Sequence, residues 1–145
     1  LSENAKKRIN ILKKSTDGFE ISEEDMEMGM GIHGEPGVWR GNLKKADNIA
    51  NEMVDMLLAD INVVSGARMS VLVNSLGATP QEELYILYRI VKERLESVGV
   101  KIVMPLVGRY ATSMEMAGMS ITTFKMSDNL KKNLFAESNC PFWKN

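Results

Sequence analysis

The sequence predicts an α/β domain in two layers, a mixed β-sheet with helices packed on one of its faces. Two helical stripes, over residues 43–60 and 84–98, alternate with short apolar runs over residues 69–73 and 100–107. A helix that joins two strands makes a crossover connection, and such a connection lets the strands pair in parallel. The element order β-α-β-α-β-β-α contains two crossovers, so we expect parallel and antiparallel pairs in one sheet.

Composition places the chain among ordinary globular proteins. Its 145 residues are enough for one domain with a core, and 44% are hydrophobic and 26% charged. A net charge of −1 gives no reason to expect nucleic acid or an anionic membrane as a partner. No apolar run reaches the ~20 residues of a membrane span. The lone Cys140 and single histidine exclude a Cys/His zinc site and favour a reducing, cytoplasmic location.

The first elements are the least defined. Residues 1–18 are basic and polar, and residues 8–12 fit a strand or part of a helix equally well. The chain begins at Leu1 rather than methionine, so we expect it to be a piece of a longer protein. Residues 26–32 alternate with period two, which predicts a strand with methionines on one face.

The later elements have clearer boundaries. Asn42 is the expected N-cap of the helix over residues 43–60. A capping box at residues 79–82, with Pro80 in the first turn, predicts the start of the next helix, and Gly99 predicts its end. Pro105 indicates an edge strand or a bulge. Residues 110–118 are a loop or a single helical turn, residues 120–126 a strand, and residues 128–134 a short helix. The aromatic tail, residues 139–143, is expected to pack back on the domain or on a partner.

His33 is the main candidate functional residue. The predicted strand carries Gly29 and Gly31 on the face opposite its methionines, and it ends in His33 and the turn at residues 34–37. Glycine in a strand often marks the close approach of a ligand or of another backbone. A neutral imidazole nitrogen can add to a ketone carbonyl and give a hemiaminal, which glycerol, having no carbonyl, cannot form. The simpler alternative is a surface histidine with no chemistry.

Three stretches carry a resemblance to a known family. They read GMGIHGEPG at residues 29–37, VNSLGATP at residues 73–80 and GRYATSMEMAG at residues 108–118. In this order they resemble the dihydroxyacetone (glycerone) kinase family, specifically the second, C-terminal α/β domain of its substrate-binding subunit, a DegV-like architecture. The resemblance covers residues 19–145, whereas residues 1–18 match poorly.

The resemblance implies a function for the assembly. It implies that His33 captures dihydroxyacetone or a similar short-chain ketose as a hemiaminal, with Gly31 and Gly34 beside the substrate. A terminal hydroxyl is then phosphorylated by a separate nucleotide-binding subunit or domain that holds ATP or ADP with Mg²⁺. We expect no cofactor or metal on this chain, no activity of the chain alone, and a homodimer.

Several residues are weaker candidates for a pocket or an interface. Glu35 either polarises a nearby group or is a solvated turn residue. The remaining candidates come from the segment after the strand at 69–73 and from an aromatic–basic pair suited to a partner surface: Asn74, Gly77, Thr79, Trp39 and Arg40. For Asn74 to Thr79, shaping a pocket or a subunit contact is favoured over direct ligand binding. Two other functions stay open: a regulatory dihydroxyacetone-binding paralogue that signals to a transcription factor, and a structural or dimerisation domain in which His33 is idle.

Overall fold

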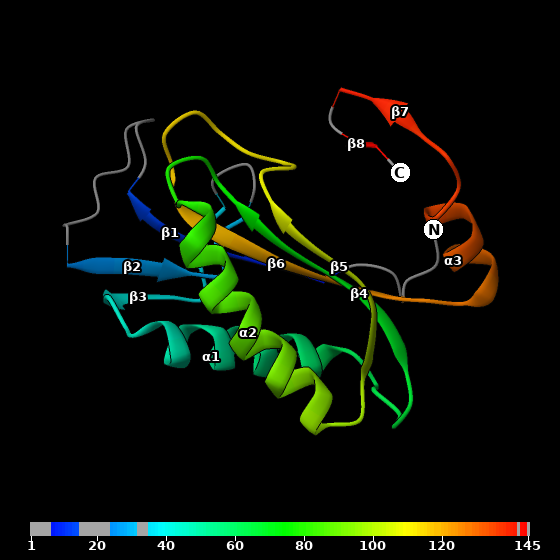
Figure 1. The fold of residues 1–145 in the computed structure, drawn as a ribbon. Coiled ribbons are helices and arrows are strands. Elements are labelled where there is room, and N and C mark those ends of the chain that lie inside the picture. The colour runs from blue at the N-terminus through cyan, green and yellow to red at the C-terminus, as the bar shows by residue number, and fades with distance from the viewer. Residues whose placement is uncertain (1–6, 15–23, 32–34, 142, 145) are drawn as a thin grey trace.

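The computed structural model describes residues 7–14, 24–31, 35–141 and 143–144. It contains a six-stranded sheet, two long helices on one face of that sheet, and a short helix with a small hairpin near the C-terminus (Figure 1). The elements in chain order are β1 (Lys7–Lys14), β2 (Asp25–Met28), β3 (Trp39–Asn42), α1 (Ala46–Asp60), β4 (Arg68–Ser75), α2 (Gln81–Ser97), β5 (Lys101–Gly108), β6 (Ala117–Lys125), α3 (Asp128–Leu134), β7 (Asn139–Cys140) and β8 (Trp143–Lys144).

The sheet is mixed, as the sequence predicts. Its strand order is β3-β2-β1-β6-β4-β5, and β4 pairs with β5 in parallel while the other neighbouring pairs are antiparallel. Helix α2 makes the crossover between the two parallel strands. Strand β5 lies at the edge of the sheet, so Pro105, which has no N–H to donate, stands where the prediction put it.

The core lies between the sheet and the two long helices. Strand β4 turns Met69, Val71 and Val73 toward this layer, and all three side chains are fully buried. Helices α1 and α2 cross the same face of the sheet (Figure 1) and bury one stripe each. The fold class predicted from the sequence is therefore confirmed: a mixed sheet covered by helices on one face.

Some boundaries differ from the prediction. Strand β2 ends at Met28 rather than at residue 32, because Gly29 has a φ of +78° and turns the chain out of the strand. Helix α1 begins at Ala46, not at residue 43, and Asn42 is no cap. The chain stays extended there because the Leu43 N–H donates to the Glu24 carbonyl at 2.6 Å and prolongs the pairing of β3 with β2.

The prediction of a capping box at residues 79–82 was also wrong. Pro80 is itself the N-cap of α2, and no side chain caps the helix. The Thr79 hydroxyl donates instead to the Gly118 carbonyl at 2.8 Å, a partner 39 residues away that local pattern does not reveal. Gly99 does end the helix, with a φ of +85° and its N–H donated to Glu96.

The remaining elements lie toward the two ends of the chain. The segment that fitted strand or helix is strand β1, which pairs with β2 on one side and β6 on the other. Strand β3 and the β7–β8 hairpin were not predicted. Trp143 packs back on the domain against Tyr110, with ring centroids 5.9 Å apart, while Phe142 lies outside the described residues. Across the described chain, no helix combines the length and apolar character that crossing a bilayer requires.

Candidate functional site

The β2–β3 loop, residues 29–38, contains the main candidate, but His33 and Gly34 lie outside the described residues. The structure does describe both sides of the loop. The Val38 N–H donates to the Met28 carbonyl at 2.7 Å, and the Gly31 N–H donates to the Glu35 carbonyl at 3.0 Å. The second bond brings together residues on either side of the three that include His33, so the loop is narrow at that point.

The glycines of this loop fit a chain that packs closely on itself. A Cβ atom at Gly37 would stand 2.5 Å from the Met28 carbonyl oxygen, and one at Gly29 would stand 2.8 Å from a Val38 methyl group. A Cβ atom at Gly31 would collide with the Glu35 side chain. Close approach to backbone accounts for glycine at position 37 and a positive φ accounts for it at position 29, whereas the atoms nearest Gly31 belong to the Glu35 side chain. The face expected to be uncrowded is filled at Gly31 by Glu35.

A buried carboxylate supports the base of the loop. Glu27 is only 5% exposed, although both of its neighbours in β2 are core methionines. Its Oε1 atom accepts a hydrogen bond of 2.6 Å from the Gly37 N–H. The sequence places Glu27 on the glycine face of the strand but gives no sign of this bond, whose partners are ten residues apart.

Asn74 is fully occupied by the protein. Its amide nitrogen donates to the Ala111 carbonyl at 2.7 Å and to the Ser120 hydroxyl at 3.2 Å, and its oxygen accepts from the N–H groups of Tyr110 and Ala111. An asparagine side chain offers two donors and two acceptor sites. All four are used, so Asn74 holds the β5–β6 loop, residues 109–116, and keeps no capacity for a ligand.

The segment after β4 is similarly bonded. The N–H groups of Leu76, Gly77 and Ala78 donate to Gly118, to the Ser75 hydroxyl and to Met116 respectively. Three of the backbone donors that precede α2 are therefore already paired within the protein. Gly77 has a φ of +140°, and a Cβ atom there would meet the Ser113 carbonyl oxygen at 2.7 Å.

A cleft of about 370 Å³ opens beside this segment, between the N-terminal ends of α1 and α2 and the start of β6. Thr79 is one of its polar lining residues, and Leu43, Ile49 and Ile86 contribute apolar surface. None of the described residues of the β2–β3 loop (29–31 and 35–38) lines it. Register relates the two regions: Met28, Ile11, Met119 and Ser75 form one row across the sheet. Three strand spacings, or roughly 14 Å, thus separate the end of β2 from the end of β4.

Trp39 and Arg40, the candidate pair for a partner surface, lie in strand β3. They are neighbours in a strand, so their side chains take opposite faces. The Trp39 indole is half-buried against the core and donates to Glu52 at 2.5 Å, while Lys44 binds Glu52 at 2.6 Å and lies over the indole ring. Burial raises the pKa of Glu52, but the hydrogen bonds from Lys44 and Trp39 and the charge of Lys44 together hold that pKa below its ordinary value.

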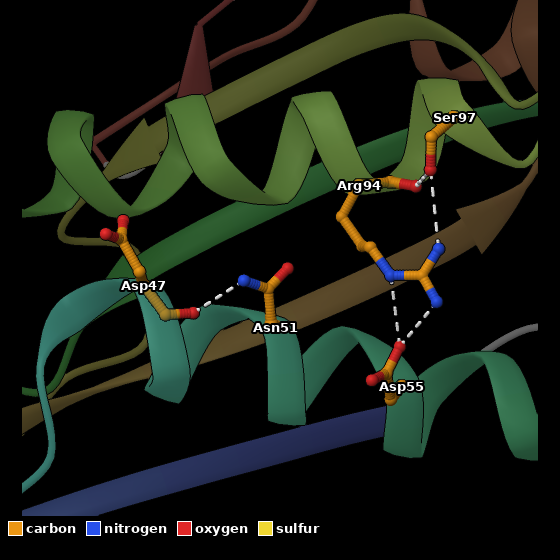
Figure 2. A network of polar contacts seen from close by, with 5 residues as sticks. All are labelled: Asp47, Asn51, Asp55, Arg94 and Ser97. Atoms are coloured by element: carbon orange, nitrogen blue, oxygen red, sulfur yellow. Dashed lines mark hydrogen bonds and ion pairs between the residues drawn. The ribbon is translucent and has the colours of Figure 1, made fainter.

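A second polar cluster joins the two long helices. Figure 2 shows Arg94 of α2 reaching Asp55 of α1, with nitrogen–oxygen distances of 2.8 and 3.1 Å, and also contacting Ser97. Asn51 donates within α1 to the Asp47 carbonyl. The Arg94–Asp55 contact joins α2 to α1, whereas the Asn51–Asp47 and Arg94–Ser97 contacts each lie within one helix. Among the described residues, no group of three or more His, Cys, Asp or Glu side chains could hold a metal ion.

The fold and the loop define a class: a mixed-sheet α/β domain that carries a glycine-rich, internally hydrogen-bonded loop between two antiparallel strands. The chain belongs to the Dak1 domain family, which matches residues 4–142.

The relatives are longer proteins. A PTS-dependent dihydroxyacetone kinase 2, dihydroxyacetone-binding subunit DhaK, of Listeria innocua is 44% identical over 126 residues, which are 87% of this chain and 38% of that protein. The dihydroxyacetone-binding subunit DhaK of the PEP-dependent dihydroxyacetone kinase of Escherichia coli is 36% identical over 76% of this chain and 38% of its own length. An L-erythrulose kinase of Pectobacterium atrosepticum is 38% identical over 87% of this chain and 22% of its length. The chain thus spans well under half of each.

Two solved structures with the same fold differ in their described roles. The dihydroxyacetone kinase of C. freundii superposes with a TM-score of 0.77 at 25% identity, over 97% of this chain and 27% of that one. A dihydroxyacetone kinase operon co-activator, Dha-DhaQ, superposes with a TM-score of 0.83 at 28% identity, over 92% of this chain and 44% of that one. Fold similarity at this level is therefore compatible with a kinase subunit and with a regulator.

Proposed function

We propose that this chain is the substrate-capturing part of a dihydroxyacetone kinase, and that His33 binds dihydroxyacetone or a similar short-chain ketose covalently. The observation that carries the proposal is the loop with the sequence GMGIHGEPG, closed by the Gly31–Glu35 hydrogen bond, in a chain of the Dak1 domain family. Relatives named as dihydroxyacetone-binding subunits and as erythrulose kinases support a ketose as the ligand.

The proposed capture step balances without a cofactor. The unprotonated ring nitrogen of neutral His33 attacks the carbonyl carbon, a C–N bond forms, and the carbonyl π bond breaks. The oxygen takes up a proton while the other ring nitrogen releases one, which leaves a neutral hemiaminal. Polyols lack the carbonyl and are excluded by chemistry rather than by shape. The adduct also holds the terminal hydroxyl in one place, which supplies proximity for the next step.

Phosphoryl transfer needs a second component in this proposal. A nucleotide-bearing subunit or domain that holds ATP with Mg²⁺ would donate the γ-phosphoryl group to the terminal hydroxyl, which loses its proton, and ADP would be left. Where phosphoenolpyruvate is the donor, a phosphotransferase relay would phosphorylate that ADP again. The chain itself then requires no cofactor, acts in the cytoplasm, and works as a homodimer. We expect the 145-residue chain, given dihydroxyacetone and ATP with no other protein, to form no dihydroxyacetone phosphate.

The experiment that tests the capture step is carbon-13 NMR of carbonyl-labelled dihydroxyacetone mixed with the protein. We expect part of the carbonyl signal to move to a tetrahedral position, and His33→Ala to abolish that signal. Asn51→Ala serves as the matched control because Asn51 makes one hydrogen bond on the helix surface, away from the loop. An adduct that persists in His33→Ala would refute the role of His33.

A second candidate function is regulation. The superposition on a dihydroxyacetone kinase operon co-activator, at 28% identity, favours a protein that binds the same ketose and signals instead of catalysing. Both functions predict the adduct, so turnover must separate them. Adding a nucleotide-bearing kinase subunit with ATP should give dihydroxyacetone phosphate if the chain serves a kinase. An adduct without product, under conditions in which a known kinase pair is active, would favour the regulator.

A further inference from the structure

We propose that Glu27 is a positioning residue for the β2–β3 loop: its buried carboxylate holds Gly37, which follows His33 by four residues, against strand β2. The anchoring itself follows from described atoms. Its consequence for ligand capture rests on the proposed function of His33.

Burial makes the Glu27 carboxylate an unusual feature of the strand. The side chain is 5% exposed and lies between Met26 and Met28 in sequence, both fully buried. A buried carboxylate is costly unless donors compensate the lost water. The Gly37 N–H is such a donor, at 2.6 Å from Oε1, and a hydrogen bond to an ionised acceptor is stronger than one to a neutral acceptor.

The Glu27–Gly37 contact depends on glycine at its other end. Any Cβ atom at position 37 would come within 2.5 Å of the Met28 carbonyl oxygen and 2.7 Å of the Glu27 Cγ atom. Real Cβ atoms essentially never approach other atoms so closely. Position 37 therefore has to be glycine for its N–H to reach the carboxylate. The hydrogen bond depends on Glu27 and on Gly37 together.

The anchor lies at the base of the segment that must be positioned. The Val38 N–H and the Met28 carbonyl close the loop beside the anchor, and the Gly31–Glu35 bond closes it again further out. Catalytic groups lose rate steeply when displaced by about 1 Å. Releasing Gly37 from the strand removes the side-chain bond that ties the C-terminal half of the loop to β2, so His33 should add to a carbonyl less readily.

The test compares Glu27→Ala with Glu27→Gln, which keeps a carbonyl oxygen at the acceptor position. Two quantities are measured: the hydrogen exchange of the amides at positions 37 and 38, and the apparent Kd for adduct formation with labelled dihydroxyacetone. For Glu27→Ala we expect both to rise about ten- to hundredfold. For Glu27→Gln we expect a rise of about threefold. Glu137→Ala, at an exposed glutamate near the C-terminus, should change neither.

A general loss of structure is excluded by requiring that each variant unfold cooperatively. If Glu27→Ala does not fold, Gly37→Ala provides a second route, because it leaves the carboxylate in place and displaces position 37 instead. It should raise both quantities in the same way. Unchanged exchange and affinity in Glu27→Ala, or in Gly37→Ala where only that variant folds, would overturn the proposal. So would a Glu27→Gln variant as impaired as Glu27→Ala, since the acceptor would then not be what matters.

The two proposals can fail separately. If the unsubstituted protein forms no adduct, the proposed function of His33 fails, and the exchange measurements still decide whether Glu27 anchors the loop. If the adduct forms with equal affinity in the unsubstituted protein and in Glu27→Ala, the function stands and the positioning role of Glu27 falls.

Discussion

Asn74→Ala should destabilise the domain more than its small change in volume implies. Asn74 is fully buried in strand β4, and its side chain makes four hydrogen bonds to the β5–β6 loop and to Ser120. Alanine fits the same space but makes none of them. The loop, residues 109–116, would then lose the side chain that joins its first residues to the sheet.

The magnitude follows from how well water can replace each bond. A typical intramolecular hydrogen bond contributes about 1 kcal/mol net, and a buried group left without a partner costs about 1–3 kcal/mol. Ala111 is exposed and Tyr110 is half-buried, so water can reach part of what they lose. Ser120 is fully buried, and water cannot replace its partner. Together these terms predict a loss of roughly 2–4 kcal/mol in the free energy of unfolding.

Urea denaturation followed by circular dichroism measures this free energy. The matched control is Asn51→Ala, which removes one exposed hydrogen bond within helix α1 (Figure 2) and should cost less than about 0.5 kcal/mol. If Asn74→Ala came within about 1 kcal/mol of Asn51→Ala, the four bonds would not stabilise the fold as their geometry implies.

Three further predictions concern charge and backbone. Because the folded protein lowers the pKa of Glu52 below 4.5, its ionised form stabilises the fold above that pH, and this contribution is lost as pH falls through the lowered value. Glu52→Gln should therefore cost about 1 kcal/mol at pH 7 and almost nothing in strong acid, as compared by urea titrations; an equal cost at both pH values would contradict this. Burial, and then a nearby carboxylate, raises the pKa of Tyr88 above 10.0, so the fold should lose stability as pH rises past 10.0. Tyr88→Phe should abolish that loss without changing stability at pH 7, and identical alkaline unfolding of the two proteins would refute it. Gly77→Ala should destabilise more than Gly66→Ala in thermal unfolding, because both glycines have a positive φ but only a Cβ at position 77 meets the backbone of another segment. Equal losses at the two positions would show that the contact is relieved freely.

Much of the fold could be predicted from local pattern. The stripes of α1 and α2, the buried run in β4 and the short helix α3 each depend on residues within a few positions of one another. Gly99 and Pro105 could also be interpreted from the sequence alone. Gly99 adopts a positive φ after helix α2, and Pro105 lacks the N–H that a strand in the middle of a sheet would donate. Hydrophobic periodicity and the special backbone residues were sufficient to predict these elements, because each element depends on residues that are close together in the sequence.

The candidate site was only partly predictable. The alternation through Gly29 and Gly31 predicted a strand as far as residue 32, so only the turn at residues 34–37 marked the β2–β3 loop. The motif at residues 29–37 pointed to His33, whose role stays a prediction. What the pattern could not distinguish was the reason for glycine. The sequence allowed a ligand or a backbone to approach closely, and the structure shows the loop's own atoms at Gly29, Gly31 and Gly37.

The sequence by itself determined which faces of the two long helices are apolar, where helix α2 ends and which segment carries the family motif. Only the tertiary structure decided that β1 is a strand, because the pairing with β2 and β6 defines that strand and the pattern of its own residues does not. It likewise decided that Asn74 serves a loop 36 residues away, that Thr79 bonds Gly118 instead of capping a helix, and that Glu27 reaches Gly37. The physical reason is common to all of them. A polar group of the backbone or of a side chain takes the partner that the folded sheet brings within about 3 Å, and no local pattern records which partner that is.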